Sequence, residues 1–189
     1  MALVTRQRPK LSLLSSSVAG REFWWKDADS GRWVLGLADE DGIENRTKAL
    51  HWKTGGRERL FLTNLKFPIV EDSNVDIALF EGNTNDYKRT RKDIVQQYTR
   101  VIALGELKAG IDPAGADEHW KTANFALNRI RSGFAEQGAN PKICFIAAAI
   151  SPRMGRDICK QIKAKLLTHA SNLTNDEQLA MTCSWLTSL

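Results

Sequence analysis

The chain has 189 residues, of which 42% are hydrophobic and 26% charged, a composition that fits one globular domain and excludes disordered and fibrous classes. Its 27 lysines and arginines outnumber its 22 aspartates and glutamates, so the formal net charge is +5, which favours a polyanionic partner. No apolar run is long enough for a membrane-spanning helix, and three cysteines without a C-x-x-C pair favour a reducing compartment, the cytoplasm, over a disulfide framework or zinc ribbon.

The N-terminal part is the least readable. Residues 1–21 contain basic side chains and serines but no acidic residue; this composition is shared by organellar transit peptides, although we favour a flexible basic arm. Residues 22–57 are rich in tryptophan and show no clear hydrophobic period. We therefore predict an N-terminal arm and Trp-rich segment over residues 1–57, followed by a second unit over residues 58–189.

Four strands are expected after residue 57, each of them a short apolar run between polar or proline-containing turns. They cover residues 59–65, 74–80, 101–108 and 143–150. The last run is apolar throughout, which predicts that both of its faces are buried in a sheet.

Four helices are expected among and after these strands. Residues 85–99 carry apolar residues at helical spacing, and in residues 116–136 Trp120 belongs to an apolar stripe that recurs at intervals of three and four. Ser151 reads as the N-cap of a third helix that begins at Pro152 and has an apolar stripe extending to Leu166. Thr174 resembles the first residue of a capping box that opens the last helix. This order predicts a mixed α/β domain with one central sheet.

The residues with the clearest chemical potential lie at the end of the predicted strand 101–108. Because side chains alternate along a strand, Glu106 and Lys108 point to one face and Leu107 to the other. Asp76 interrupts another apolar strand, where a charge needs a partner. If the two strands are neighbours, Asp76 and Glu106 converge on one cation, and hard oxygen ligands select Mg²⁺. The spacing alone leaves open a simpler interpretation, a salt bridge at the strand end.

A longer string carries a family resemblance. Residues 104–131, LGELKAGIDPAGADEHWKTANFALNRIR, resemble type II restriction endonucleases of the AvaI/BsoBI and XcyI kind, members of the PD-(D/E)xK nuclease superfamily. The resemblance extends more loosely over residues 74–150, and we find none over residues 1–57. Two positions depart from the family pattern: Val75 stands where the superfamily has its namesake proline, and Ala109 replaces a glycine.

The resemblance implies a fold and an activity. The fold would be an α/β core in which a mixed central sheet is flanked by helices, as in restriction endonucleases. The activity would be Mg²⁺-dependent, sequence-specific cleavage of double-stranded DNA that leaves 5′-phosphates. A homodimer is also implied, since two-fold protein symmetry matches a palindromic site.

The resemblance also assigns roles to single residues. Asp76 and Glu106, with the backbone carbonyl of Leu107, correspond to the metal ligands, and Lys108 corresponds to the lysine that orients the attacking water. His119 matches a histidine near the active site, although a histidine at this place in a helix is also typical of a polar surface residue. Asp112 matches an acid that reads base edges, although a residue before proline is also typical of a turn. Trp120 is interpreted as core.

Two basic clusters are candidates for contacts with DNA phosphates, although such runs also occur on solvated helix faces. The first cluster, which we favour, consists of Lys88, Arg89, Arg91 and Lys92. The second consists of Arg153, Arg156, Lys160, Lys163 and Lys165.

Two alternatives to a restriction enzyme remain open. One is a PD-(D/E)xK nuclease of repair or defence without a fixed recognition site. The other is a truncated or decayed nuclease-fold protein that binds DNA without cutting it. The second is motivated by length, because enzymes of this group are generally longer and have helical regions ahead of the catalytic core.

Overall fold

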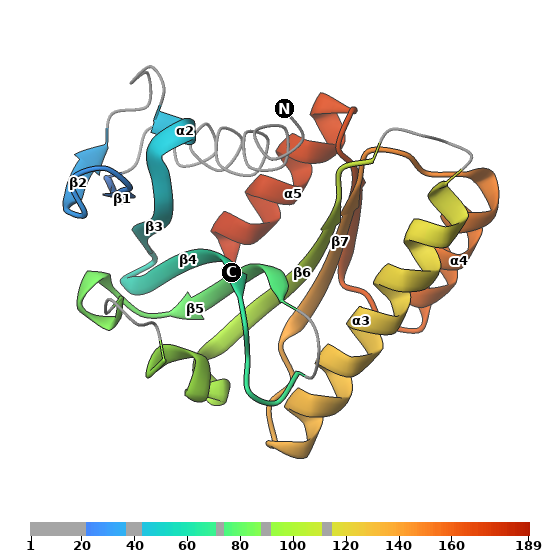
Figure 1. Ribbon diagram of the computed structural model, residues 1–189, viewed down its shortest axis with the longest axis horizontal. Helices are drawn as coiled ribbons and strands as arrows, with labels where there is room; N and C mark the ends of the chain where they lie inside the picture. The colour runs from blue at the N-terminus through green and yellow to red at the C-terminus, as the bar shows by residue number, and fades with distance from the viewer. Residues whose placement is uncertain (1–21, 37–42, 71–73, 88–91, 111–114) are drawn as a thin grey trace.

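The structure, a computed structural model, describes residues 22–36, 43–70, 74–87, 92–110 and 115–189. The strands in these ranges are β1 (Phe23–Asp27), β2 (Trp33–Gly36), β3 (Thr47–Thr54), β4 (Arg57–Leu65), β5 (Val75–Glu81), β6 (Val101–Lys108), β7 (Lys142–Ala147) and β8 (His169–Asn172). They form one sheet in the order β2-β1-β3-β4-β5-β6-β7-β8 (Figure 1). Neighbours from β2 to β6 are antiparallel, whereas β6, β7 and β8 are parallel.

Helices cover both faces of this sheet. They are α2 (Ile43–Arg46), α3 (Ala116–Glu136), α4 (Pro152–Lys163) and α5 (Asp176–Ser188), with short 3-10 helices η1 (Thr84–Asp86), η2 (Ile94–Gln96) and η3 (Tyr98–Arg100). Figure 1 shows α3 and α4 side by side, and their buried residues share a core cluster with Leu60, Ala78 and Leu104 of the sheet. Residues of α5 pack in a second cluster with Ile77 and Leu107. The mixed sheet between these helices confirms the predicted α/β class.

The four predicted strands are all present, as β4, β5, β6 and β7, and the predicted bounds of β6 and α3 are those of the structure. Trp120 is 6% exposed and packs edge-on against Phe145, with ring centroids 5.1 Å apart, which confirms its place in the core. The strands β1, β2, β3 and β8 were not predicted from the sequence. The domain boundary after residue 57 stays a prediction; it falls within β4, which pairs with β3.

Three expectations about helices were wrong. In place of a helix over residues 85–99, the described part of that segment contains η2 and most of η1 and of η3. Its buried residues Ile94 and Val95 lie in η2, which ends after one turn because Gln97 has a φ of −93° and a ψ of 65°, outside the helical region. The N-cap of α5 is Asn175, whose side chain accepts a hydrogen bond from the Gln178 amide; it is not Thr174.

The apolar stripe of α4 is shorter than predicted. The Ser151 side chain caps α4 as predicted, by accepting a hydrogen bond from the Met154 amide. The helix ends at Lys163, however, and Leu166 is 45% exposed. Lys165 has a φ of 58°, a left-handed conformation that ends a helix. None of the helices in the described ranges is long and apolar enough to cross a membrane.

Candidate functional site

Asp76 and Glu106 lie on adjacent strands and on the same face of the sheet. Ala78 pairs with Leu104 and Ile77 with Gly105 in the antiparallel register of β5 and β6, and continuing this register places Asp76 opposite Glu106. Opposite residues of an antiparallel pair point to the same face. That face also carries Ala78 and Leu104, which pack beneath α3. The two carboxylates predicted to converge are therefore brought together.

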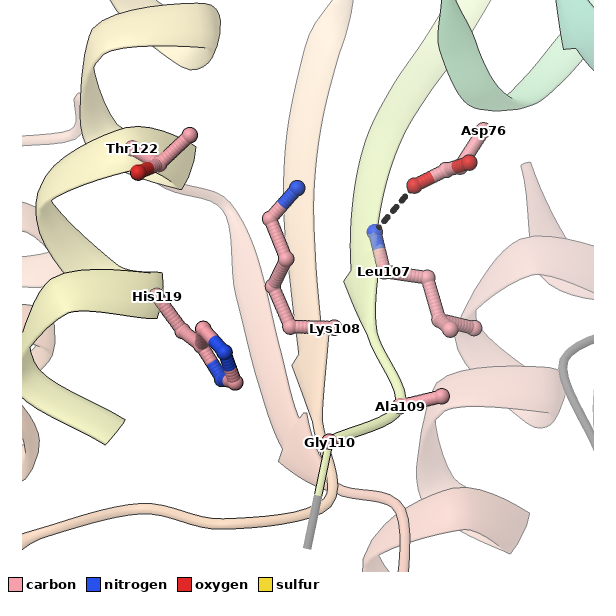
Figure 2. A pocket seen from close by; sticks show the side chains of 7 residues that line it. All are labelled: Asp76, Leu107, Lys108, Ala109, Gly110, His119 and Thr122. Atoms are coloured by element: carbon pink, nitrogen blue, oxygen red, sulfur yellow. Dashed lines mark hydrogen bonds between the residues drawn. The ribbon is translucent and has the colours of Figure 1, made fainter. Parts of the chain in front are cut away.

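Asp76 is anchored to the neighbouring strand by its own side chain. Its Oδ2 atom accepts a hydrogen bond of 2.8 Å from the backbone amide of Leu107 (Figure 2). The Lys108 carbonyl faces the other side of β6, where it accepts a hydrogen bond from Ala148. Because successive carbonyls alternate along a strand, the Leu107 carbonyl faces the Asp76 side. The carbonyl of Leu107, the residue after Glu106, and the Asp76 carboxylate thus lie on the same side of β6.

Glu106 is the most buried charged residue of this group. It is 3% exposed, and its Oε2 atom accepts a hydrogen bond of 3.3 Å from Lys108 Nζ. Cys144 on β7 is the register partner of Gly105, and burial, together with the negative charge of Glu106, raises the pKa of its thiol to about 12. The thiol therefore stays protonated and contributes no charge to the site.

A pocket of about 350 Å³ opens beside Asp76 and Lys108, and Glu106 is not among the residues that line it. Asp76, Leu107 and Lys108 line it from the strands, and His119 and Thr122 line it from α3. In Figure 2 the Lys108 side chain extends between Asp76 on one side and the α3 residues on the other. The strand carboxylate, the amine and the imidazole, which are far apart in the sequence, therefore share one cavity.

His119 enters the pocket because Gly110 leaves room for its ring. A Cβ atom on Gly110 would lie 2.5 Å from His119 Cε1, so any side chain at residue 110 would displace the imidazole. Sequence analysis did not single out Gly110 or Thr122 as site residues. Thr122 could have been found, since it lies three residues after His119 on the same helix face. The contact made by Gly110 depends on packing and has no sequence signal.

The start of α3 is also tied to the start of α4. Ser151, the N-cap of α4, donates a hydrogen bond of 2.6 Å from its hydroxyl to Asp117 Oδ1 in the first turn of α3. Asp117 is two residues before His119. This link restrains the turn from which the imidazole projects.

Other predicted site residues are not part of this pocket or are not described. Asp112, Lys88, Arg89 and Arg91 lie outside the described residues. Lys92 is exposed, ahead of η2 in the segment that leads to the beginning of β6, whereas the pocket lies at the end of that strand. The basic residues of the second cluster are all exposed and do not line the pocket.

The donor set suits a hard divalent cation. Within the described residues no cluster of three or more His, Cys, Asp or Glu side chains is suited to hold a metal. Two carboxylates and a backbone carbonyl agree with Mg²⁺, which binds protein through one or two carboxylates and keeps several waters. The residues present therefore fit such an ion.

The known proteins that this chain resembles are restriction endonucleases. A family model described as "Restriction endonuclease BsobI" matches residues 2–189. Type II restriction enzyme AvaI from Nostoc sp. is 40% identical over 187 residues, which cover 99% of this chain and 58% of the relative, and AvaI from Anabaena variabilis gives the same values. Type II restriction enzyme BsoBI from Geobacillus stearothermophilus is 38% identical over 188 residues, covering 98% and 57%.

The matches cover nearly all of this chain but only part of its relatives. The chain spans less than two thirds of the length of the curated relatives it matches. The family match also includes the N-terminal third, so the expectation that the resemblance is absent from residues 1–57 was wrong. The tryptophan-rich segment belongs to the same family pattern as the candidate site.

Proposed function

The chain belongs to the BsoBI restriction endonuclease family, and on this premise we propose that it is a type II restriction endonuclease that cleaves double-stranded DNA at a specific sequence. The observation that carries the proposal is the placement of Asp76, Glu106 and Lys108 on one sheet face at the end of β6. A strand-end salt bridge explains the contact between Lys108 and Glu106. It does not explain why Asp76 and His119 line the same pocket beside that pair.

Asp76, Glu106 and the Leu107 carbonyl would hold Mg²⁺. When bound, such an ion lowers the pKa of a nearby water and offsets negative charge at the phosphorus. The hydrogen bond from the Leu107 amide holds one oxygen of the Asp76 carboxylate against the backbone of β6. Fixed orientation of both carboxylates is what an ion site requires before the substrate arrives.

Lys108 acts on the water and on the phosphate. Its amine, 27% exposed at the side chain, reaches the pocket while staying in contact with Glu106. It orients the water for in-line attack and stabilises the charge that develops on the phosphate oxygens. A bond forms from the water oxygen to phosphorus and the bond to the 3′ oxygen breaks, which leaves a 5′-phosphate and a 3′-hydroxyl.

His119 faces the pocket from the opposite wall. The imidazole can accept or donate a proton at its ring nitrogens, and its place beside Lys108 suits proton movement to or from the reacting oxygens. We propose a supporting part for His119 in this chemistry. Base reading by Asp112 and phosphate contacts by Lys88, Arg89, Arg91 and Lys92 are part of the same proposal.

The test is plasmid cleavage by the purified chain at low salt, with Mg²⁺ and with EDTA. We expect discrete bands that require the metal. Glu106→Gln and Lys108→Ala should each lower the rate at least about 100-fold, because one removes an ionic ligand and the other the amine. Lys142→Ala is the matched control, since Lys142 is an exposed lysine at the beginning of β7, away from the pocket.

Each other result would contradict a defined part of the proposal. A metal-dependent smear would replace the restriction enzyme with a nuclease that has no fixed site. DNA binding without cleavage would indicate a nuclease fold that has lost its activity. Full activity of Glu106→Gln or Lys108→Ala, with unchanged thermal unfolding, would remove this pocket as the active site.

A homodimer is part of the proposal. Two copies related by a two-fold axis would present one active site to each strand of a palindromic sequence. Sedimentation velocity of the chain with a cognate duplex should then show two protein copies for each duplex. A single copy on a duplex that is nonetheless cut on both strands would contradict the dimer.

A further inference from the structure

A second pocket, of about 390 Å³, lies at the other end of the sheet from the candidate active site. We call it the Trp24 cleft. Its walls come from β1, β2, β3 and β4 and from the turn that follows β5. In Figure 1 the strands β1 and β2 lie at the left of the molecule, whereas α3 and α4 lie at the right. None of the roles proposed above uses this pocket.

The Trp24 cleft has aromatic walls that are only half buried. Trp24 and Trp33 both line it. The Trp24 ring lies 5.4 Å from the imidazole of His51, centroid to centroid. Trp33 packs edge-on against Tyr87, and Lys26 Nζ lies 5.6 Å from the centroids of both of these rings. Half-buried indole rings that line a pocket are suited to stack on a planar ring.

The floor of the Trp24 cleft is polar, and one of its buried nitrogen atoms makes no hydrogen bond within the described part of the chain. His51 is 4% exposed, its Nε2 atom contacts Glu58 Oε2, and its buried Nδ1 atom makes no hydrogen bond to the part of the chain that the structure describes. Lys53 Nζ lies 3.2 Å from Glu58 Oε1. Burial pushes the pKa of Glu58 upward, but hydrogen bonds from His51 and Lys53 bring it below the ordinary value. The cleft therefore presents an ionised carboxylate between an imidazole and a lysine.

The remaining wall is held rigid. Asn83 accepts a hydrogen bond from the Asn85 amide and donates its own amide to Asp86. Arg100 clamps Asp86 with two hydrogen bonds, of 2.9 and 2.8 Å. Bidentate pairs of this kind fix geometry as well as adding energy. The turn thus keeps the pocket open without a bound ligand to order it.

The Trp24 cleft opens on the same face of the sheet as the active site. Trp24 pairs with His51, His51 with Leu60 and Leu60 with Phe80, which is four residues from Asp76 along β5. Four residues of strand and two strand spacings correspond to a separation of roughly 16 Å between His51 and Asp76. This distance is comparable to a few nucleotides of an extended strand.

From these features we propose that the Trp24 cleft binds one unstacked nucleotide. The base stacks on Trp24 and Trp33, its exocyclic amino group donates to Glu58, and its phosphate lies against Lys53. A carboxylate accepts hydrogen bonds from an amino group such as cytosine N4 but repels the O4 acceptor of thymine. The cleft should therefore prefer cytosine to thymine, two pyrimidines of nearly equal size. The nucleotide can be free or part of a DNA strand.

Calorimetric titration in EDTA tests this inference independently of cleavage. The probes are deoxycytidine and thymidine monophosphates and the single-stranded tetramers of the same two nucleotides. We expect cytidylate to bind more tightly than thymidylate. Trp24→Leu should weaken binding roughly 5- to 100-fold, and Glu58→Gln should erase the preference for cytosine. Trp185→Phe is the matched control, because Trp185 stacks on His169 among the residues of the α5 side.

The outcomes separate the two sources of the ligand. Binding of the monophosphate with these effects assigns the cleft to free nucleotides, and binding of the tetramer alone with the same effects assigns it to a DNA strand. No binding of any probe, equal binding of cytosine and thymine, or binding that neither variant alters would overturn the proposal. If Trp24→Leu does not fold, Glu58→Gln decides the question, since it removes a charge at a half-buried position without opening a cavity.

Discussion

Gly105, which precedes Glu106 on β6, has no room for a side chain. A Cβ atom at this position would lie 2.4 Å from the Sγ atom of Cys144 and 3.2 Å from the Cys144 carbonyl oxygen. Gly105 and Cys144 are register partners of the parallel β6–β7 pair, and Cys144 is fully buried. We therefore expect Gly105→Ala to lower the free energy of unfolding and to disturb the strand that carries Glu106.

The size of the effect follows from these two contacts. Forcing one methyl group into a close-packed interior costs about 1–3 kcal/mol. Cys144→Ala removes the Sγ atom and should cost about 1 kcal/mol by itself through lost burial. In the double variant the 2.4 Å contact is gone and the 3.2 Å contact to the carbonyl remains. The cost of Gly105→Ala should then fall by about 1–2 kcal/mol, which is the coupling energy of the pair.

Urea denaturation followed by circular dichroism measures these differences from midpoints at constant slope. Gly155→Ala is the control, because the nearest atom to a Cβ there is 3.8 Å away and a glycine-to-alanine change within α4 should stabilise the protein by roughly 0.5–1 kcal/mol. Strictly additive effects of Gly105→Ala and Cys144→Ala, or an unchanged midpoint for Gly105→Ala, would refute the steric argument.

Other substitutions test other contacts. Gly110→Ala should displace the His119 ring from the pocket and lower the cleavage rate as much as His119→Ala does; a rate unchanged in both variants would return His119 to the role of a polar surface residue. Gly133→Ala should lower the free energy of unfolding by about 3 kcal/mol, because a Cβ there would lie 2.3 Å from the backbone carbonyl of Ile69; a neutral effect in urea denaturation would contradict this packing. Burial lowers the pKa of His169 below its ordinary 6.5, so the unfolded chain binds this proton at higher pH than the folded chain, and stability should fall as pH drops from 6.5 toward the folded pKa. His169→Gln should flatten that part of the pH profile, and an equally steep profile in the variant would show that another group is responsible.

The sequence was most informative where hydrophobic periodicity is strong. The bounds of β6 and α3 could be predicted because their apolar residues recur with the periods of a strand and of a helix. The strand β8 has the sequence HASN, which is too short and polar to give such a signal. In β1, buried Phe23 and Trp25 alternate with half-buried Trp24. Because both faces of the strand carry aromatic residues, the sequence shows no alternation of apolar and polar residues.

The chemistry of the site was partly readable in the same way. Glu106 and Lys108 share a face by the geometry of a single strand, so their neighbourhood follows from their spacing. The catalytic role of Glu106 and Lys108 could be predicted only from the family resemblance over residues 104–131, because a simple salt bridge would have the same spacing. The N-cap of α5 was misplaced by one residue since Thr174 and Asn175 are both good capping residues, and only the path of the chain into the helix selects between them.

The sequence by itself determined properties that depend on near neighbours: the periods of β6 and α3, the Ser151 cap of α4, the basic charge and the residue types of the site. The tertiary structure alone decided that β5 lies beside β6, so that Asp76 binds the amide of Leu107 across 31 residues of sequence. It also placed Gly110 against His119 and assembled the Trp24 cleft from four strands and a turn. The physical reason is that such contacts depend on how whole elements pack, and packing is set jointly by residues that local sequence patterns do not connect.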